Sequence, residues 1–416
     1  MIKIDISKYL ENFKIRKDLN DFIDNAGRTR IEHIRIRNQI FPKYINEFWT
    51  SKQRQASSIH EISYRACFKP QLPRFFIKLL TNLNDIVYDP FSGRGTTIIE
   101  AGLLKRRVIS NDVNPLSEIL ARPRLNIPRL NDIKKRIYEI PRDLGIKNDI
   151  DLSMFYHEKT EAEILALRQY LYERKENNEE DDIDRWIRMV ATNRLTGHSN
   201  GFFSVYTLPP NQAVSQESQI RINKKRNQVP EYKDTKVRII KKTESLLRNL
   251  TQQQKENLNR CGETAMFICK DARDTDEISD NSVQLTVTSP PFLDIVQYDK
   301  DNWLRCWFNM IDVEEISKRI TMEKNLDDWL RVMADIFIEL YRITKKGGWV
   351  AFEVGEVKKG TINLEEYIIP IGLDARFVCK GIIINLQKFT KTSKIWGIDN
   401  NNLGTNTNRI VLFKKV

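Results

Sequence analysis

The chain has 416 residues, of which 40% are hydrophobic, and it carries a formal net charge of +12 with a pI of about 9.3. This length predicts two domains, and the basic balance favours a polyanionic partner. The five cysteines form no CxxC pair and the four histidines are not spaced for metal binding, which argues against a disulfide framework or a zinc site. No apolar run approaches the roughly 20 residues of a membrane span, and the N-terminus is too charged for a signal peptide, so we expect a cytoplasmic protein.

The first 50 residues are basic and predict a largely helical N-terminal arm, in which Arg28, Arg30, Arg35 and Arg37 lie close together.

A strand, a glycine-containing turn and a helix follow each other at residues 86–103. Such a unit begins a doubly wound sheet, in which ligands bind outside the carboxyl end of the strand. Gly93 and Gly95 allow close approach of a ligand to the backbone. The spacing is neither G-x-G-x-x-G nor a phosphate loop, and Asp89 at the strand end suits a cationic group. A second strand ends at Asn111 and Asp112, where an acidic side chain can hold ribose hydroxyls.

Residues 119–262 form a long insertion before the third strand. Its first part has charged residues at helical spacing, and residues 192–215 are polar, aromatic and broken by Gly and Pro, which predicts a loop. Ten Lys or Arg then stand against three acids from residue 221 to residue 248. Basic residues beside amides and aromatics suit contact with phosphates and base edges.

We therefore expect the nucleic-acid contacts in this insertion. The candidates for phosphate contact are Arg221, Lys224, Lys225 and Arg226. The candidates for the pocket rim or for base contacts are Asn193, Arg194, His198, Asn200 and Asn211. The alternatives are a solvated helix face for the basic run, a buried loop histidine for His198, and packing onto the core for Phe202, Phe203 and Tyr206.

The remaining strands follow the insertion. The segment AMFICKDARD predicts a third strand that ends at Asp271, and residues 283–287 predict a buried strand. Thr288-Ser289-Pro290-Pro291-Phe292 comes next; its prolines end the strand and leave carbonyl oxygens without a following N–H to pair with. A hydroxyl and an aromatic ring around these carbonyls make a cup for a flat heterocycle. The segment ITKKGGWVAFEVGE predicts another strand, and the tail predicts a β-hairpin.

These segments resemble the DNA amino-methyltransferases that use S-adenosylmethionine. DPFSGRGTT is similar to the cofactor loop of that family, and TSPPF is similar to its catalytic loop in the form associated with the cytosine-N4 branch. The resemblance covers residues 60–118 and 264–416. The cofactor loop precedes the catalytic loop, the reverse of the order in many cytosine-N4 enzymes, so the usual position of the target-recognition region does not transfer.

The resemblance implies an α/β fold: a doubly wound methyltransferase sheet with helices on both faces and a terminal β-hairpin. The charged residues at helical spacing add a mainly helical inserted region. The expected organisation is a helical arm (1–50), a catalytic domain (51–118 and 263–416) and an inserted region (119–262) that is the candidate for DNA target recognition.

The resemblance also implies the cofactor, S-adenosylmethionine, and the residues around it. Asp89 and the turn after it face the methionine part, Asp112 holds the ribose, and Asp271 accepts a hydrogen bond from the adenine amine. For these acids the alternative is helix capping or turn bonding, and Asp274 is close enough to replace Asp271. The expected cofactor-binding residues are Tyr64, Phe68, Pro70, Asp89, Phe91, Ser92, Gly93, Gly95, Thr96, Thr97, Asn111, Asp112, Asp271 and Ala272.

The expected catalytic residues are Ser289, Pro290, Pro291 and Phe292. The target base must leave the duplex, because its amine is paired and stacked there. Phe292 stacks on the flipped ring, and the Ser289 hydroxyl and the Pro290 carbonyl accept hydrogen bonds from the amine. Transfer then depends on positioning, with no need for a metal. No cysteine stands in the catalytic loop, which speaks against cytosine-C5 chemistry.

The resulting hypothesis is a site-specific DNA methyltransferase that modifies the N4 amine of cytosine in duplex DNA. Such an enzyme suits a restriction-modification system with a cognate restriction endonuclease. Three alternatives stay open: adenine-N6 methylation, against which only Ser289 argues; an RNA amino-methyltransferase acting on tRNA; and a catalytically silent DNA-binding protein, against which the two intact loops argue.

Overall fold

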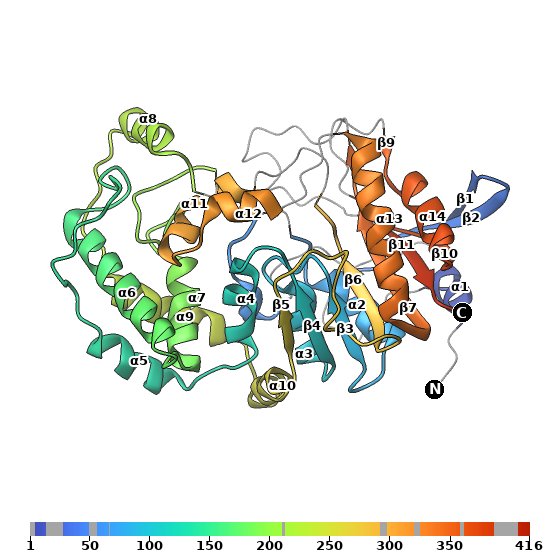
Figure 1. Ribbon diagram of the computed structural model, residues 1–416, viewed down its shortest axis with the longest axis horizontal. Helices are drawn as coiled ribbons and strands as arrows, with labels where there is room; N and C mark the ends of the chain where they lie inside the picture. The colour runs from blue at the N-terminus through green and yellow to red at the C-terminus, as the bar shows by residue number, and fades with distance from the viewer. Residues whose placement is uncertain are drawn as a thin grey trace.

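A nine-stranded mixed sheet forms the centre of the computed structural model (Figure 1). The structure describes residues 5–13, 28–49, 56–65, 67–209, 213–291, 298–319, 325–357, 362–386 and 407–416. The strand order in the sheet is β1-β2-β10-β11-β7-β6-β3-β4-β5, and β8 and β9 form a separate pair. The strands are β1 (Arg30–Ile36), β2 (Gln39–Asn46), β3 (Ile86–Asp89), β4 (Arg107–Asn111), β5 (Met266–Ile268), β6 (Val283–Thr288), β7 (Thr344–Val354), β8 (Glu356–Val357), β9 (Ile362–Asn363), β10 (Val378–Leu386) and β11 (Thr407–Lys414).

Five strands of the sheet, β7-β6-β3-β4-β5, run parallel. β11 is antiparallel to both β7 and β10, so the predicted terminal hairpin β10–β11 extends the sheet beyond β7. Successive residues of each strand face opposite sides of the sheet. Val87 of β3 therefore joins one hydrophobic cluster and Tyr88 joins the other.

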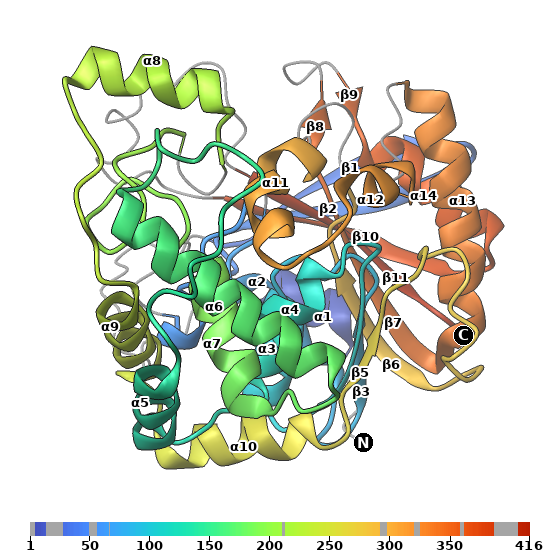
Figure 2. The same ribbon diagram turned by 60° about the vertical axis from the view of Figure 1, so that its left-hand side comes forward.

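Helices cover both faces of the sheet, as Figures 1 and 2 show. α2 and α3 pack on the face of Val87, and α13 and α14 pack on the face of Tyr88. The predicted doubly wound α/β sheet is confirmed. The helices are α1 (Ile6–Glu11), α2 (Gln71–Leu80), α3 (Thr96–Leu103), α4 (Leu116–Ala121), α5 (Leu130–Glu139), α6 (Glu158–Glu176), α7 (Asp182–Thr192), α8 (Gln216–Arg226), α9 (Thr235–Leu247), α10 (Gln252–Gly262), α11 (Tyr298–Phe308), α12 (Val313–Arg319), α13 (Leu326–Ile343) and α14 (Glu365–Asp374), with short 3₁₀ helices η2 (Ser58–His60) and η3 (Arg122–Arg124).

The N-terminal region corrects one expectation. A helical arm was expected over 1–50, but residues 30–46 form the hairpin β1–β2, and β2 pairs parallel with β10 at the edge of the sheet. The hairpin buries Ile36, Phe41 and Ile45 against the core, and this packing outweighs the helical impression of the charged residues. Arg30 and Arg37 are ion-paired with Glu32 and Asp374, so they do not form one basic cluster.

The inserted region is helical, as predicted, and runs from η3 to α10. Figure 2 shows α6, α7 and α9 grouped beside the sheet, with α8 standing apart above them. α10 packs on α3, and Trp186 of α7 belongs to the same hydrophobic cluster as Val87 of the sheet. The division of the chain into a catalytic and a recognition domain stays a proposal.

Candidate active site

The turn between β3 and α3 brings the backbone close to its neighbours. Gly93 and Gly95 adopt φ angles of 50° and 76°. A Cβ at Gly95 would lie 2.6 Å from the Cβ of Ala121, so this position needs glycine for both conformation and space. The ring of Tyr64 faces Gly93 from the other side.

Asp89 joins the cofactor loop to the strand that carries the catalytic loop. Its carboxylate accepts hydrogen bonds from the Thr288 hydroxyl at 2.7 Å and from the Phe91 N–H at 3.2 Å. Burial raises the pKa of Asp89 to about 6. The two segments that the sequence singled out, about 200 residues apart, are therefore in direct contact.

Asp112 follows β4 and holds the same turn from the opposite side. Its two oxygens accept the Gly93 N–H at 2.8 Å and the Asn114 N–H at 3.0 Å. Burial raises the pKa of Asp112 to about 6, in opposition to these two hydrogen bonds. Each carboxylate oxygen has a further lone pair, which is what binding of a pair of ribose hydroxyls requires.

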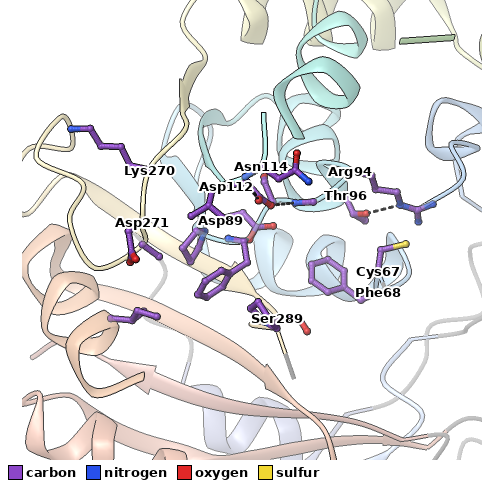
Figure 3. A pocket seen from close by; sticks show the side chains of 18 of the residues that line it. Cys67, Phe68, Asp89, Arg94, Thr96, Asp112, Asn114, Lys270, Asp271 and Ser289 are labelled. Carbon is purple, nitrogen blue, oxygen red and sulfur yellow. Dashed lines mark hydrogen bonds between the residues drawn. The ribbon is translucent and has the colours of Figure 1, made fainter. Parts of the chain in front are cut away.

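A single pocket at the carboxyl ends of β3, β4 and β6 unites the predicted residues (Figure 3). In Figure 3 Asp271 and Phe68 lie at opposite ends of this pocket, with Asp89 and Asp112 between them. The assignment of an adenine end at Asp271 and a methionine end at Phe68 stays a prediction. The predicted residues that line the pocket are Tyr64, Phe68, Asp89, Phe91, Ser92, Gly93, Thr96, Asp112, Asp271, Ala272, Ser289 and Pro291.

Five predicted residues, Pro70, Gly95, Thr97, Asn111 and Pro290, are not among the lining residues. The Thr97 hydroxyl on α3 donates to the Val287 carbonyl at 3.1 Å, which ties α3 to β6. The Asn111 side chain binds the backbone of Lys270 in both directions, at 3.0 and 3.1 Å. Both side chains support the pocket from behind.

The Asp271 carboxylate is hydrogen-bonded to the side chain and backbone of Arg273. Burial opposes ionisation of Asp271, but these bonds and the Arg273 charge hold its pKa below the usual value. Asp271, which is predicted to accept a hydrogen bond from the adenine amine, is thus an ionised carboxylate at neutral pH.

The pocket also contains residues that the sequence reasoning missed. Trp329, Val332, Met333 and Ile336 of α13 form an apolar wall at the spacing i, i+3, i+4, i+7, which is a signal readable in the sequence. The indole N–H of Trp329 donates to the Pro291 carbonyl at 2.9 Å and fixes the end of the catalytic loop. The other missed lining residues are Cys67, Pro90, Arg94, Val113, Asn114 and Lys270.

Ser289 is half-buried at the pocket, directly after β6, and Pro290 is buried. Phe292 lies outside the described residues. The hydroxyl of Ser289 is hydrogen-bonded to the carboxyl group of Glu353 on β7, which also accepts a hydrogen bond from the Asn408 amide. Burial raises the pKa of Glu353 to about 7. No motif marks Glu353, and only the pairing of β6 with β7 brings it to Ser289.

The candidates for nucleic-acid contact separate into buried and exposed groups. Asn193 and Arg194 are buried, and the guanidinium of Arg194 packs 3.9 Å from the centre of the Phe202 ring. Burial, reinforced by Arg305, lowers the pKa of Arg194 to about 10. His198 and Asn200 are exposed on the loop, and Asn211 lies outside the described residues.

Arg221, Lys224, Lys225 and Arg226 are exposed on α8, and Arg226 packs 3.8 Å from the centre of the Tyr206 ring. Among the described residues, no group of His, Cys, Asp and Glu could hold a metal ion. None of the helices in the described part of the chain combines the length and the apolar character that a membrane crossing requires.

Comparison with known proteins finds a family match for part of the chain and two related proteins. Residues 10–119, which include the turn at Gly93 and Gly95, match the N6_N4_Mtase family, described as DNA methylase. The type II methyltransferase M.BsoBI of Geobacillus stearothermophilus is 26% identical over 334 residues, covering 71% of this chain and 62% of that protein. The type II methyltransferase M.MjaII of Methanocaldococcus jannaschii is 27% identical over 148 residues, covering 34% of this chain and 27% of that protein.

The chain thus spans less than two thirds of the length of either relative. The crystal structure of TrmN from Thermus thermophilus is 10% identical with a TM-score of 0.33, over 86% of this chain and 52% of that chain, a superposition too loose to add support. The chain is therefore similar to the N6/N4 DNA methylase family over residues 10–119, and distantly similar to two type II methyltransferases.

Proposed function

We propose that this chain is a site-specific DNA methyltransferase that methylates an exocyclic amine of a base turned out of the duplex, and that the amine is N4 of cytosine. The hydrogen bond between Thr288 and Asp89 carries the proposal, because it places the start of the catalytic loop against the cofactor loop. Ser289 and Pro291 line the same pocket as Asp112 and Asp271. The setting we propose is the modification half of a type II restriction-modification system, with a cognate endonuclease as its partner.

The cofactor is S-adenosylmethionine. The pocket residues fit it: Asp112 offers carboxylate oxygens for the ribose, Asp271 lies at the far end for the adenine amine, and the apolar wall of α13 suits the purine face. Tyr64 and Phe68 close the methionine end. Once bound, S-adenosylmethionine supplies a methyl group activated by its sulfonium.

The residues of the chain orient the amine. The Ser289 hydroxyl can accept a hydrogen bond from the amine only if its own hydrogen points elsewhere, and the Glu353 carboxylate is the acceptor that takes it. The Pro290 carbonyl, which has no following N–H to pair with, accepts the second hydrogen. These two bonds draw the amine lone pair out of conjugation with the ring and aim it at the cofactor side of the pocket.

The choice of cytosine rests on Ser289, because the adenine-N6 branch usually carries Asp or Asn at this position. Adenine-N6 methylation is the second candidate, since the fold and the cofactor pocket serve both reactions equally.

The product nucleoside tests the function. The protein is incubated with labelled S-adenosylmethionine and mixed duplex DNA, the DNA is digested to nucleosides, and the labelled nucleoside is identified by mass spectrometry. We expect N4-methylcytosine. N6-methyladenine would retain the family and overturn the role of Ser289 in base choice. If the DNA stays unlabelled and a parallel incubation with tRNA labels the tRNA, the substrate would be RNA instead of DNA. Absence of label in both incubations would favour a silent DNA-binding protein.

We also propose that α8 is the main phosphate-contacting element. It is basic and exposed, and it is held to the body by the buried Gln219, which binds the Tyr206 carbonyl at 3.1 Å. The segment before α8 contacts α11, the helix that follows the catalytic loop, because Trp303 donates to the Val214 carbonyl at 3.2 Å. A duplex on α8 would therefore lie beside the catalytic loop.

Neutralising Arg221, Lys224 and Lys225 together with Gln is expected to weaken DNA binding and to flatten its salt dependence. Each lost phosphate contact reduces the slope of log K against log salt by about 0.9 for duplex DNA. Fluorescence anisotropy over a salt series measures this slope. The matched control is the triple change to Gln at Lys105, Arg107 and Arg260, three exposed cations beyond the amino end of β4. An equal loss in both variants would reduce the effect to net charge and remove α8 from the interface.

A further inference from the structure

Residues 58–65, here called the strap, connect the N-terminal hairpin region to the cofactor pocket. Within the strap only Ser58–His60 forms a helical turn, and the rest has no regular structure. Tyr64 lines the pocket and its ring faces Gly93 of the cofactor loop. The position of this ring therefore depends on what holds the strap backbone.

Side chains from other parts of the fold hold the backbone carbonyls of the strap. Arg124 donates to the Ile59 carbonyl at 3.4 Å, and Arg94 donates to the Ile62 carbonyl at 2.7 Å. Both arginines are buried; Arg124 lies on η3 and Arg94 lies in the cofactor loop. They fix the first half of the strap to the sheet side of the molecule.

The Ser63 carbonyl, next to Tyr64, is held from two other directions. It accepts a hydrogen bond from the Asn193 amide at 2.9 Å and another from the Arg305 guanidinium at 3.1 Å. Asn193 caps the C-terminus of α7 in the inserted region, and Arg305 lies on α11, which follows the catalytic loop. Exposure is only 2% for Asn193 and 6% for Arg305, so neither side chain is available as a surface contact.

The Ser63 carbonyl is thus the point where the inserted region, the helix after the catalytic loop and the cofactor pocket meet. Arg305 also donates to Asn302 on its own helix at 2.8 Å, and its guanidinium lies 5.8 Å from the centre of the Tyr64 ring. A carbonyl that receives two donors from rigid helices is restrained in both position and direction. Loss of either donor removes one of the two side-chain restraints on the Ser63 carbonyl next to Tyr64.

We propose that Asn193 and Arg305 are positioning residues that set Tyr64 for the cofactor and so make cofactor affinity depend on the inserted region. The proposal rests on the assignment of the pocket to S-adenosylmethionine. Asn193 acts on the cofactor only through the strap, because its amide contacts the Ser63 carbonyl and the pocket lining does not include it.

The test is a double-mutant cycle on the full chain, read by calorimetric binding of S-adenosylhomocysteine. Asn193→Ala removes the hydrogen bond to the Ser63 carbonyl and the one that Arg194 donates to the amide oxygen at 3.0 Å. Since only the first reaches the strap, the change is expected to weaken binding about fivefold to tenfold. In a Tyr64→Ala background the same change is expected to cost nothing, because the ring through which Asn193 acts is gone. Arg305→Lys, which keeps the charge and removes the planar fork, is expected to weaken binding in the same direction.

The matched control is Asn309→Ala, which removes another buried amide between α11 and α7 without touching the strap. This amide donates to the Thr192 hydroxyl at 2.9 Å and to the backbone carbonyl of Arg305 at 2.8 Å, and its removal leaves the Arg305 guanidinium in place. The control variant is expected to bind S-adenosylhomocysteine as the wild type does. If Asn309→Ala weakens binding as much as Asn193→Ala, or if Asn193→Ala costs the same with and without Tyr64, the positioning role is wrong. Failure of the wild type to bind would instead overturn the cofactor pocket itself.

Discussion

Replacing Ser289 with Ala is expected to slow methyl transfer by about 10²-fold to 10³-fold while S-adenosylhomocysteine binding stays within about twofold of the wild type. In the proposed function its hydroxyl helps to orient the amine, and the proposed cofactor contacts at Asp112 and the apolar wall of α13 do not depend on it. Single-turnover transfer to DNA measures the first quantity, and calorimetry measures the second.

Ser282→Ala is the matched control, because Ser282 immediately precedes β6, at its opposite end, where its hydroxyl donates to the Ser279 carbonyl. It is expected to leave both quantities unchanged. Loss of cofactor binding in Ser289→Ala would mean that the loop belongs to the cofactor site and that the amine is oriented elsewhere.

Glu353→Gln is expected to remove a pH dependence from the reaction. The pKa of Glu353 is raised to about 7 by burial, so the carboxylate that accepts the Ser289 hydrogen forms as the pH rises through about 7. In the wild type, single-turnover rates should therefore rise with pH around this midpoint. The variant should be about tenfold slower at pH 8, the scale of replacing a hydrogen bond to a charged acceptor by one to a neutral amide, and flat across the range.

The contribution of Glu353 to the free energy of unfolding should fall as the pH rises, which is opposite to its effect on the rate. The raised pKa gives the folded state a contribution that is complete below the ordinary value of 4.5 and is lost as the pH rises through about 7. The variant should consequently melt at a higher temperature than the wild type at pH 8, with little difference at pH 4. A midpoint near pH 7 that persists in Glu353→Gln would assign the titration to another group, such as Asp89 or Asp112, whose pKa values are about 6.

The sequence predicted most of the sheet because short apolar runs ended in chemically distinctive residues. Asp89, Asp112 and Ser289 each follow such a run, and the parallel strands bring the three to one edge. The N-terminal hairpin was missed because its first strand, RIEHIRI, is mostly exposed and breaks the alternation of a strand at Glu32 and His33. The hairpin joins the sheet only through the pairing of β2 with β10, more than 300 residues away.

The remaining pocket residues were missed for the same physical reason, which is that their contacts depend on tertiary structure. Glu353 becomes part of the site only through the pairing of β6 with β7, and Trp329 only through the packing of α13 over the sheet. Asn193 was expected at the rim of a base-binding pocket, but tertiary packing turns it inward to Ser63. A local sequence pattern can identify the end of a strand. It cannot identify a residue that packs against that end from another strand or helix.

The common hydrophobic cluster of α7 and β3 has a consequence for engineering. Exchanging residues 119–262 for the corresponding stretch of a relative, in order to transplant the proposed recognition region, would replace Trp186 and its buried neighbours in α7 as well as the exposed helix α8. Cores lose several kcal/mol when facing residues no longer match in volume, roughly 2–5 kcal/mol for one large truncation. The outer face of α8 can instead be exchanged alone, since Gln219 is the only residue of that helix buried in the body, and this would change the proposed phosphate contacts without disturbing the core.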